Sequence, residues 1–307
     1  MIFYTSHNNC YISNSLQYGF VYLLHKSLQF DKLMTKQRLD VLLVELNLTS
    51  SRQLAQRLIQ AGEVLVNQQV IDKVGTLVDT TAQIQVKQRS PFVSRGGEKL
   101  AKALKCFTIP IAGRICLDGG ISTGGFTDCL LQAGAKLVYG VDVGYGQVDW
   151  RIRNDSRVIL KERTNLRYLT PNELYKDEEI ADLAVVDVSF ISLAKILPSL
   201  WQLLQSPRDA VLLVKPQFEV GKERVGKKGV VRDTDDQADA IAQVITAAQA
   251  IGWQYCDLTW SPVTGPAGNI EYLLWLSINS QNSPPDLATL KQIAKTAKEE
   301  LSNTANT

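Results

Sequence analysis

The chemistry open to this chain is indicated by four charged residues: Lys99, Asp187, Lys215 and Glu271. Each stands at the edge of an expected helix or strand within one glycine-rich α/β stretch, where active-site groups usually collect. The chain has only two histidines, His7 and His25, and both lie among the first 33 residues, outside the α/β stretch. Proton transfer must therefore use lysine, carboxylate, tyrosine or thiol groups.

A glycine-rich run, Asp118-Gly-Gly-Ile-Ser-Thr-Gly-Gly-Phe126, follows the expected strand 115–117 and opens a helix. Glycine lets the backbone turn sharply beside a ligand, and a helix N-terminus offers free N–H groups. Asp142 ends the next expected strand, where a carboxylate can accept two ribose hydroxyls. The spacing is not GxGxxG; it resembles the first motif of class I methyltransferases, which bind S-adenosylmethionine. A nicotinamide site and a purely structural turn are the alternatives.

That resemblance predicts a set of residues that bind the cofactor, including Asn165 after the third strand, which would touch the adenine. The set is Asp118, Gly120, Ser122, Thr123, Gly124, Gly125, Phe126, Asp142, Val143 and Asn165.

These residues need a scaffold, which the apolar runs provide. Short β-rich runs stand at 115–117, 137–141, 158–160, 183–186, 210–214 and 271–278, and helical patterns at 125–132, 191–204 and 234–250 separate several of them. Strands that alternate with helices predict an α/β fold: a Rossmann-like, mostly parallel sheet with helices on both faces.

A small α+β module is predicted before this domain. Leu39, Leu42, Leu43 and Leu46 recur at helical spacing, and Ser51 begins a second helix that ends near Gln60. A hairpin is expected over 64–71, although Gln68 stands where glycine would favour the turn.

The runs Gln37-Arg-Leu-Asp40, Ser51-Arg52 and Gly62-Glu-Val-Leu-Val-Asn67 resemble a small RNA-binding domain of ribosomal proteins, here called S-four-like. The resemblance implies contacts with RNA phosphates, and ordinary exposed basic residues are the alternative. The predicted RNA-binding residues are Lys36, Arg38, Arg52, Arg57 and, in the larger domain, Arg95.

The order of the four charged residues resembles that of the heat-shock-type (FtsJ-like) ribose 2′-O-methyltransferases. With the S-four-like module, residues 36–279 resemble the hemolysin A (TlyA-type) family of ribosomal RNA ribose methyltransferases. The matching motifs are Ser-Arg-Gly-Gly-x-Lys at 94–99, Asp-x-Gly-x-Ser-Thr-Gly-Gly-Phe-Thr-Asp at 118–128, Val-Lys-Pro-Gln-Phe-Glu at 214–219, Gly-Val-Val-Arg-Asp at 229–233 and Gly-x-x-Gly-Asn-x-Glu at 265–271. The resemblance implies S-adenosylmethionine as cofactor, ribosomal RNA and ribosomal subunits as partners, and no metal.

A ribose hydroxyl is a poor nucleophile until it loses its proton. Keeping an isolated lysine neutral at pH 7 costs about 4–5 kcal/mol, and burial or a like-charged neighbour lowers that cost. We therefore expect Lys215 to be the general base, helped by Lys99 and oriented by Asp187. Glu271 would hold Lys99 or bind the sugar. The alternative is that all four are surface salt-bridge partners.

Other transfer chemistries lack their residues. After the fourth strand the chain reads Asp187-Val-Ser-Phe190, without the Pro-Pro-aromatic motif of base-amino methyltransferases and without a cysteine nucleophile. Ser189 and Phe190 are open to a packing role, and Tyr145 and Trp150 either stack on an unpaired base or pack in the core. A non-catalytic RNA-binding or ribosome-assembly factor and a membrane-active hemolysin remain alternative functions.

Composition supports a globular protein, with 45% hydrophobic residues, 21% charged residues and a net charge of +2. The runs 87–105, 151–167 and 215–232 each hold six basic residues and one or two acidic ones. Such runs indicate either a surface that binds a polyanion or simply a solvated face of the protein. Five cysteines without a CxxC pair favour a reduced, cytoplasmic setting. The apolar run 18–24 is too short to span a bilayer, so no stable membrane association is expected.

These patterns divide the chain into five parts. We expect an extension over 1–33 without a role in the fold, since Met34 is a plausible start, and an S-four-like domain over 34–89. A linker at 90–93, a methyltransferase domain over 94–280, and a C-terminal helix and tail over 281–307 follow. The oligomeric state is left open.

Overall fold

The computed structural model describes residues 35–86, 90–176 and 178–304. The chain divides into two compact units, 1–89 and 90–307. The predictions for residues 1–33, including both histidines, lie outside the described residues. Within the described ranges, no helix is both long and apolar enough to cross a membrane, and no cluster of three or more His, Cys, Asp or Glu could hold a metal ion.

The first unit is a small α+β domain. Its elements are β1 (Lys36–Arg38), α1 (Leu39–Glu45), α2 (Arg52–Gln60), β2 (Val64–Val66), β3 (Gln69–Ile71), β4 (Leu77–Asp79) and β5 (Ile84–Val86). Strands pair in the order β3-β2-β5, with β1 and β4 forming a second pair. Ser51, expected as the first residue of this helix, is the N-cap of α2: its Oγ accepts the N–H of Leu54 at 3.2 Å. The β2–β3 turn has positive φ at both Asn67 (48°) and Gln68 (67°).

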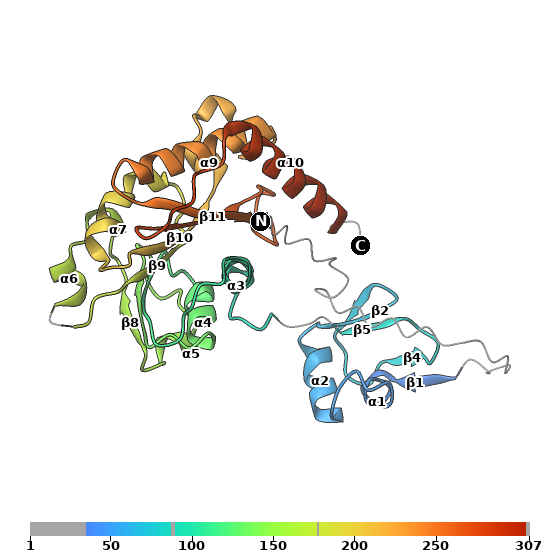
Figure 1. Ribbon diagram of the computed structural model, residues 1–307. Coiled ribbons are helices and arrows are strands. Elements are labelled where there is room, and N and C mark those ends of the chain that lie inside the picture. The colour runs from blue at the N-terminus through green and yellow to red at the C-terminus, as the bar shows by residue number, and fades with distance from the viewer. Residues whose placement is uncertain (1–34, 87–89, 177, 305–307) are drawn as a thin grey trace, which may run out of the picture. The chain divides into compact units, whose positions relative to one another are not determined.

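The second unit is built on one sheet of seven strands, in the order β11-β12-β10-β9-β6-β7-β8 (Figure 1). The strands are β6 (Ile115–Gly119), β7 (Leu137–Val141), β8 (Val158–Lys161), β9 (Leu183–Val186), β10 (Asp209–Val214), β11 (Gln254–Trp260) and β12 (Tyr272–Ser277). Neighbours from β10 to β8 pair in parallel, whereas β12 is antiparallel to β10 and to β11. The predicted mostly parallel sheet is confirmed, while β11 was not predicted.

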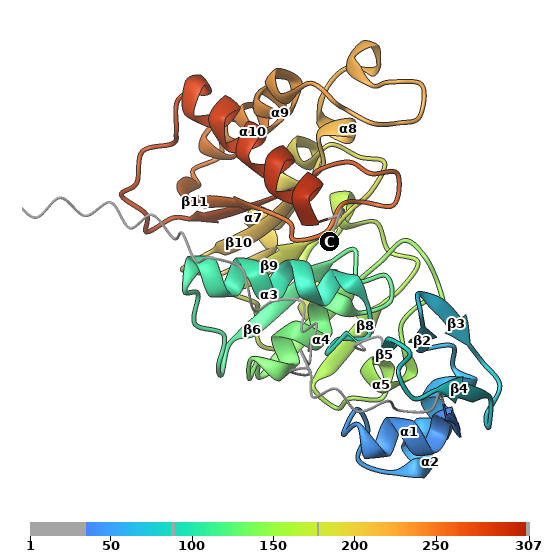
Figure 2. The ribbon, with the colours of Figure 1, turned by 90° about the vertical axis from the view of Figure 1, so that its right-hand side faces the viewer.

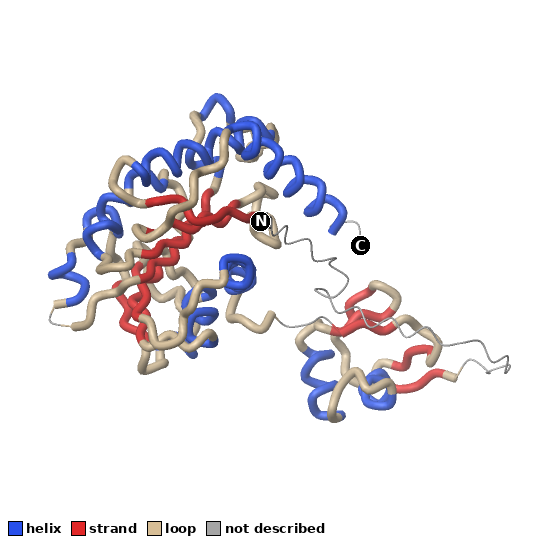
Figure 3. Tube along the Cα trace, viewed as in Figure 1, coloured by secondary structure: helices blue, strands red, loops and turns tan. Residues whose placement is uncertain are grey.

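Helices cover both faces of this sheet (Figures 1 and 3). They are α3 (Arg95–Phe107), α4 (Gly125–Gln132), α5 (Trp150–Arg153), η1 (Leu166–Tyr168), α6 (Pro171–Tyr175), η2 (Leu193–Lys195), α7 (Leu197–Leu203), α8 (Pro216–Glu219), η3 (Lys222–Arg224), α9 (Thr234–Gln249) and α10 (Leu287–Thr304). The expected single helix over 191–204 is two elements, η2 and α7. Pro198 lies in the first turn of α7, where its missing N–H costs nothing.

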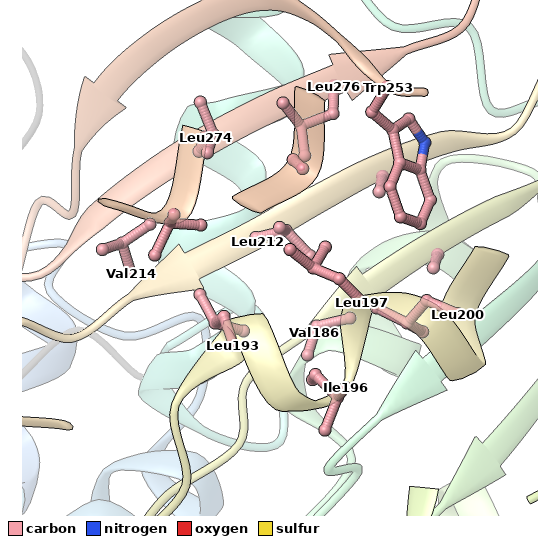
Figure 4. Close-up of a cluster of buried hydrophobic side chains, with 14 of the residues drawn as sticks. Val186, Leu193, Ile196, Leu197, Leu200, Leu212, Val214, Trp253, Leu274 and Leu276 are labelled. Atoms are coloured by element: carbon pink, nitrogen blue, oxygen red, sulfur yellow. The ribbon is translucent and has the colours of Figure 1, made fainter. Parts of the chain in front are cut away.

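Two apolar layers hold the sheet in place. One face packs against α7, α9 and α10 through residues such as Leu197, Ile241 and Leu290, and the other packs against α3 and α4 through Leu100 and Leu130. Figure 4 shows the first layer, with side chains of β10 and β12 facing those of η2 and α7. Side chains of the central strands are buried on both faces, which makes the sheet a rigid platform for the loops at its edge.

Candidate active site

Strand register brings three of the four charged residues to one edge of the sheet. Gly119 pairs with Val186, so Asp187 follows β9 beside the glycine-rich loop. Tyr272 pairs with Val214 across an antiparallel pair, which places the residue before β12 next to the residue after β10. The carboxyl ends of the parallel strands and the amino end of β12 therefore meet at one edge, the usual ligand edge of such sheets.

The four side chains form a chain of alternating charge. Lys99 Nζ lies 2.6 Å from Glu271 Oε2 and 3.9 Å from Asp187 Oδ2, and Lys215 Nζ lies 2.5 Å from Asp187 Oδ1. Lys99 reaches the others from the second turn of α3, on the helix face that also buries Leu100. Lys215 Nζ additionally donates to Ser189 Oγ at 2.9 Å. Residues as far as 172 positions apart are thus in direct contact.

These ions are removed from bulk water. The exposed fractions of the side chains are 11% for Lys99, 9% for Lys215, 22% for Asp187 and 2% for Glu271. Two ammonium groups facing two carboxylates cancel in charge, and burial strengthens each contact relative to a surface pair. The four side chains form one largely buried cluster, and its most exposed member, Asp187, lines a cavity.

The cavity has a volume of about 290 Å³. Its wall joins the start of α3 (Ser94, Arg95, Gly96 and Lys99), the glycine-rich loop (Gly120, Ile121, Ser122, Thr123, Gly125 and Phe126), Asp187 and the loop before β12 (Val263, Thr264 and Pro266). Lys99 and Asp187 therefore join the charged chain to the same space that the glycine-rich loop borders.

Glycine is required at specific points of this wall. Gly120 has φ +89°, and a Cβ there would lie 2.5 Å from the carbonyl oxygen of Asp187. A Cβ at Gly125 would overlap Ser94 Oγ and approach the N of Gly97 to 2.8 Å. The starts of α3 and α4 can pack this closely only because Gly125 has no side chain.

Two aspartates hold the loops around the cavity. Asp142 Oδ2 accepts the N–H of Ser122 at 2.8 Å and Oδ1 accepts that of Gly144 at 2.7 Å. Asp118 is fully buried; Oδ2 accepts the hydroxyl of Thr127 at 2.6 Å, and Oδ1 has no hydrogen-bond partner in the described structure. Burial without a cation raises the pKa of the Asp118 carboxyl to about 7.

These features fit S-adenosylmethionine. The side-chain-free cradle at Gly120, on the cavity wall, suits a ligand that needs close backbone approach. Each carboxylate oxygen can accept a second hydrogen bond, so Asp142 retains capacity for ribose hydroxyls. Lys99 and Asp187 bring the charged chain to the cavity, where the methyl group would be transferred.

Several predicted cofactor residues do not line the cavity. Asp118 lies beneath the loop, and Gly124 faces Ile152 of α5. Val143 is exposed, as is Asn165, whose Oδ1 accepts the N–H of Arg167 at the start of η1. Asp142 also lies off the cavity wall. The cofactor roles of these five residues, like those of the five predicted residues that line the cavity, stay predictions.

The predicted RNA-binding residues separate into two groups. Arg95 lines the cavity in the second unit, whereas Lys36, Arg38, Arg52 and Arg57 are exposed in the first unit. The buried Asp40 accepts hydrogen bonds from the Nε of Arg38 at 3.0 Å and of Arg52 at 2.8 Å. The adjacent Arg38 guanidinium, with help from Gln56 and Arg52, holds the pKa of Asp40 well below its usual range.

Sequence reasoning missed parts of the site. Phe190, open to a packing role, is 91% exposed, has φ +64°, and lies with its ring centroid 5.2 Å from that of Phe218. Tyr145 and Trp150 are also exposed, which excludes core packing for both. The wall formed by residues 263–266 was missed as well, although its Pro- and Gly-rich sequence is a loop signal.

Glu219 fixes the loop that carries Phe190. Its carboxylate accepts the hydroxyl of Ser192 at 2.6 Å and the N–H of Leu193 at 2.9 Å. Burial raises the pKa of Glu219. The last residue of the Lys215–Glu219 motif therefore joins the loop after β10 to the loop after β9, and so sets Lys215 relative to Asp187.

This chain matches two known domain families. The model of the FtsJ-like methyltransferase family matches residues 92–278, and that of the S4 domain matches residues 37–84. Over 242 residues the chain is 50% identical to YqxC of Bacillus subtilis (strain 168), provisionally named an rRNA methyltransferase, covering 78% of this chain and 85% of that protein.

Two further similarities extend over most of the chain. TlyA of Mycobacterium tuberculosis (strain ATCC 25618 / H37Rv), named a 16S/23S rRNA (cytidine-2′-O)-methyltransferase, is 48% identical over 243 residues, covering 78% of this chain and 90% of TlyA. A solved structure from Streptococcus thermophilus, provisionally named a hemolysin, has a TM-score of 0.69 and 38% identity, covering 90% of this chain and all of that one. The chain thus belongs to the FtsJ-like methyltransferase family, whose methyl donor is S-adenosylmethionine, and its first unit contains an S4 domain.

Proposed function

We propose that this protein methylates a ribose 2′-hydroxyl of ribosomal RNA, with Lys215 as the general base. The observation that carries the proposal is the buried chain Lys99–Glu271 and Lys215–Asp187 beside the glycine-lined cavity. The names of TlyA and YqxC, and the S4 domain match, support ribosomal RNA as the substrate. With such a substrate, the location that we propose is the cytoplasm, together with the ribosomal subunits.

When bound, S-adenosylmethionine supplies an electrophilic methyl group. The chain must therefore bring the 2′-oxygen close to that group and take away its proton, tasks that rely on position and on general base catalysis. Lys215 acts in the state in which it has given up one proton. Its amine then accepts the hydroxyl proton and again becomes the ammonium partner of Asp187.

Lys99 keeps Asp187 paired while Lys215 acts as the base. A neutral Lys215 amine no longer balances the charge of the Asp187 carboxylate, so a second cation must do so. Lys99 Nζ, 3.9 Å from the other oxygen of Asp187, is that cation. Glu271 holds Lys99 at 2.6 Å and is nearly fully buried, which fixes the ammonium in this bridging position.

The RNA is held by groups of two kinds. The exposed Phe190 ring beside the loop of Asp187 and Ser189 offers a face on which an unpaired base can stack. In the first unit, Lys36, Arg38, Arg52 and Arg57 contact phosphates of the RNA, which positions the substrate without reading its sequence.

The test is methyl incorporation from labelled S-adenosylmethionine into ribosomal subunits, with ribose methylation mapped on the RNA. We expect wild-type protein to methylate a ribose, and Lys215→Ala to lose at least a hundredfold in kcat while calorimetry shows unchanged cofactor affinity. The matched control is Lys195→Ala, an exposed lysine of η2, which should behave as wild type.

Two outcomes would contradict the proposal in different ways. Wild-type-like turnover in Lys215→Ala would remove the general base but leave the enzyme. A wild-type protein that binds cofactor and subunits yet transfers no methyl group would favour the non-catalytic assembly factor instead.

A further inference from the structure

A buried asparagine lies two residues before Glu271 and is not part of the ammonium–carboxylate chain. Asn269 is 2% exposed. Its Oδ1 accepts the N–H of Val231 at 2.9 Å, and its Nδ2 donates to the carbonyl of Gly229 at 2.8 Å. The amide oxygen and the amide nitrogen therefore each bond to a segment some 40 residues earlier in the chain.

That segment is a tight turn with lysines at its tip. Gly226 N donates to the carbonyl of Val230 at 3.1 Å, and Gly229 N donates to that of Gly226 at 2.8 Å. The turn leaves Lys227 and Lys228 exposed. We call residues 226–232 the basic arm; it follows α8 and η3, in the loop that Figure 2 shows projecting beyond α8.

The arm and the start of β12 share one buried polar network. Beyond Asn269, the carbonyl of Val231 accepts from Gln237 Nε2 at 2.8 Å, and Gln237 Oε1 accepts the hydroxyl of Tyr272 at 2.5 Å. Gln237 and Tyr272 are at most 2% exposed. Glu271 lies between Asn269 and Tyr272 in the sequence. The hydrogen bonds that hold the arm in place therefore also hold the backbone of Glu271 in place.

The loop around Glu271 leaves little freedom for a shift. Ser261 N donates to the carbonyl of Glu271 at 2.8 Å, and Gly265 N donates to that of Asn269 at 2.9 Å. A Cβ at Gly265 would lie 2.6 Å from Glu271 Oε1. A displacement of Asn269 is therefore passed to Glu271, and from there to Lys99.

We propose that Asn269 is a positioning residue that couples the basic arm, as a contact for RNA phosphates, to Glu271 and thus to Lys99 in the methyl-transfer site. The inference rests on the proposed function. Exposed lysines on a turn suit the phosphate backbone, which binds cations with little geometric demand. A bound RNA that holds the arm also holds Glu271, so substrate binding and site geometry are linked.

The experiment is a cycle of variants assayed for kcat, for KM toward ribosomal subunits and for cofactor affinity. Asn269→Ala should lower kcat at least tenfold and raise KM several-fold, with cofactor affinity within twofold of wild type. Lys227→Ala/Lys228→Ala should raise KM and weaken its salt dependence. Lys295→Ala, at an exposed lysine of α10, is the control for the loss of a surface lysine and should change neither kcat nor KM.

Coupling is measured by combining the variants. If Asn269 seats the arm, adding Asn269→Ala to Lys227→Ala/Lys228→Ala should raise KM less than it does in the wild-type background. Additive effects on KM, or a loss of cofactor affinity that parallels the loss of kcat, would overturn the proposal. A wild-type protein without methyl transfer would instead overturn the proposed function.

A second variant covers the case in which Asn269→Ala does not fold. Asn269→Asp keeps the acceptor for Val231 N, and its protonated form can also donate to the carbonyl of Gly229. Relative to wild type at each pH, its kcat should recover at least threefold as pH falls from 8 to about 5.5. A pH-independent ratio would contradict the proposed role of the Nδ2 donor.

Discussion

Each unit of this protein gathers two cations around one aspartate, but the cations differ in their access to water. Around Asp40 the side chains of Arg38 and Arg52 are 44% and 54% exposed, while around Asp187 those of Lys99 and Lys215 are 11% and 9% exposed. In the first unit only the carboxylate is hidden, whereas in the second the ammonium groups are hidden as well.

The difference separates binding from chemistry. A buried carboxylate that fixes exposed guanidinium groups orders them for an anion outside, and arginine keeps its charge throughout. Buried ammonium groups are withdrawn from water, and lysine, unlike arginine, can lose its proton. On the proposed function, the same pairing of charges therefore presents cations to RNA in one unit and holds the proton-transfer groups in the other.

The largest expected effect breaks the buried cluster. Asp187→Asn removes the charge that Lys215 and Lys99 share, so kcat should fall about 10³- to 10⁴-fold, or roughly 4–5.5 kcal/mol. The affinity for RNA should stay within twofold, because the arginines of the first unit are untouched. Turnover and filter binding measured on one preparation check this, and equal losses in both would contradict the separation.

The next effect concerns pH and the two fully buried aspartates. Burial raises the pKa of Asp118 from 3.8 to about 7, so the native state holds this proton more tightly than the unfolded chain does. The free energy of unfolding of the second unit should therefore fall as pH rises from about 4 to 7, and then level off. The expected fall is about 4 kcal/mol, because each of some three pKa units corresponds to about 1.36 kcal/mol.

Asp40 should behave in the opposite way. Its pKa is lowered by the arginines, so its contribution is present above the ordinary pKa and is lost as pH falls below about 4. Hydrogen exchange across pH, read on peptides of each unit, checks both directions. Asp118→Asn should remove the fall in stability of the second unit between about pH 4 and 7. Asp40→Asn should remove the loss of stability of the first unit at acid pH. A pH dependence of stability that persists after the corresponding substitution would contradict this assignment.

A smaller effect is expected from the exposed cations. Arg38→Gln/Arg52→Gln should weaken RNA binding about tenfold and reduce the slope of log affinity against log salt by about 1.5 to 2, as for two lost phosphate contacts. Turnover at saturating subunits should be unchanged. A fall in kcat without a change in affinity would reverse the roles assigned to the two clusters.

The smallest effect tests the β2–β3 turn of the first unit. Gln68 has φ +67°, a conformation that costs a residue with a Cβ about 1 kcal/mol. Gln68→Gly should stabilise this unit by about 0.5–1 kcal/mol and leave methyl transfer at saturating subunits unchanged. Slower hydrogen exchange confined to the first unit is the expected observation, and faster exchange there would contradict it.

The sequence predicts the layers of the fold because they follow from local periodicity. Runs such as 137–141 and 183–186 have the apolar composition of central strands, and the cap at Ser51 is a local signal. The direction of β12 has no such signal, because an apolar strand reads alike in either direction. Its antiparallel pairing with β10 is nevertheless what puts Glu271 beside Lys215.

The same limit applies to the site. Charge and position single out Lys99, Asp187, Lys215 and Glu271, whereas the contact of Arg52 with Asp40 depends on how α1 and α2 pack. The exposure of Phe190 depends on its positive φ, which its sequence neighbours do not specify. The network of Asn269 depends on a contact with a loop 38 to 40 residues away, beyond the reach of any local pattern.

The antiparallel last strand also has a consequence for synthesis. Domains generally fold in the order in which they leave the ribosome, so the arginine-bearing module can be complete while the rest of the chain is still growing. Glu271 is joined to the chain 172 residues after Lys99, the group with which it pairs. The S4 domain can thus be folded while the cluster of buried charges in the second unit is still incomplete, because that cluster is assembled only when β12 has been made and paired.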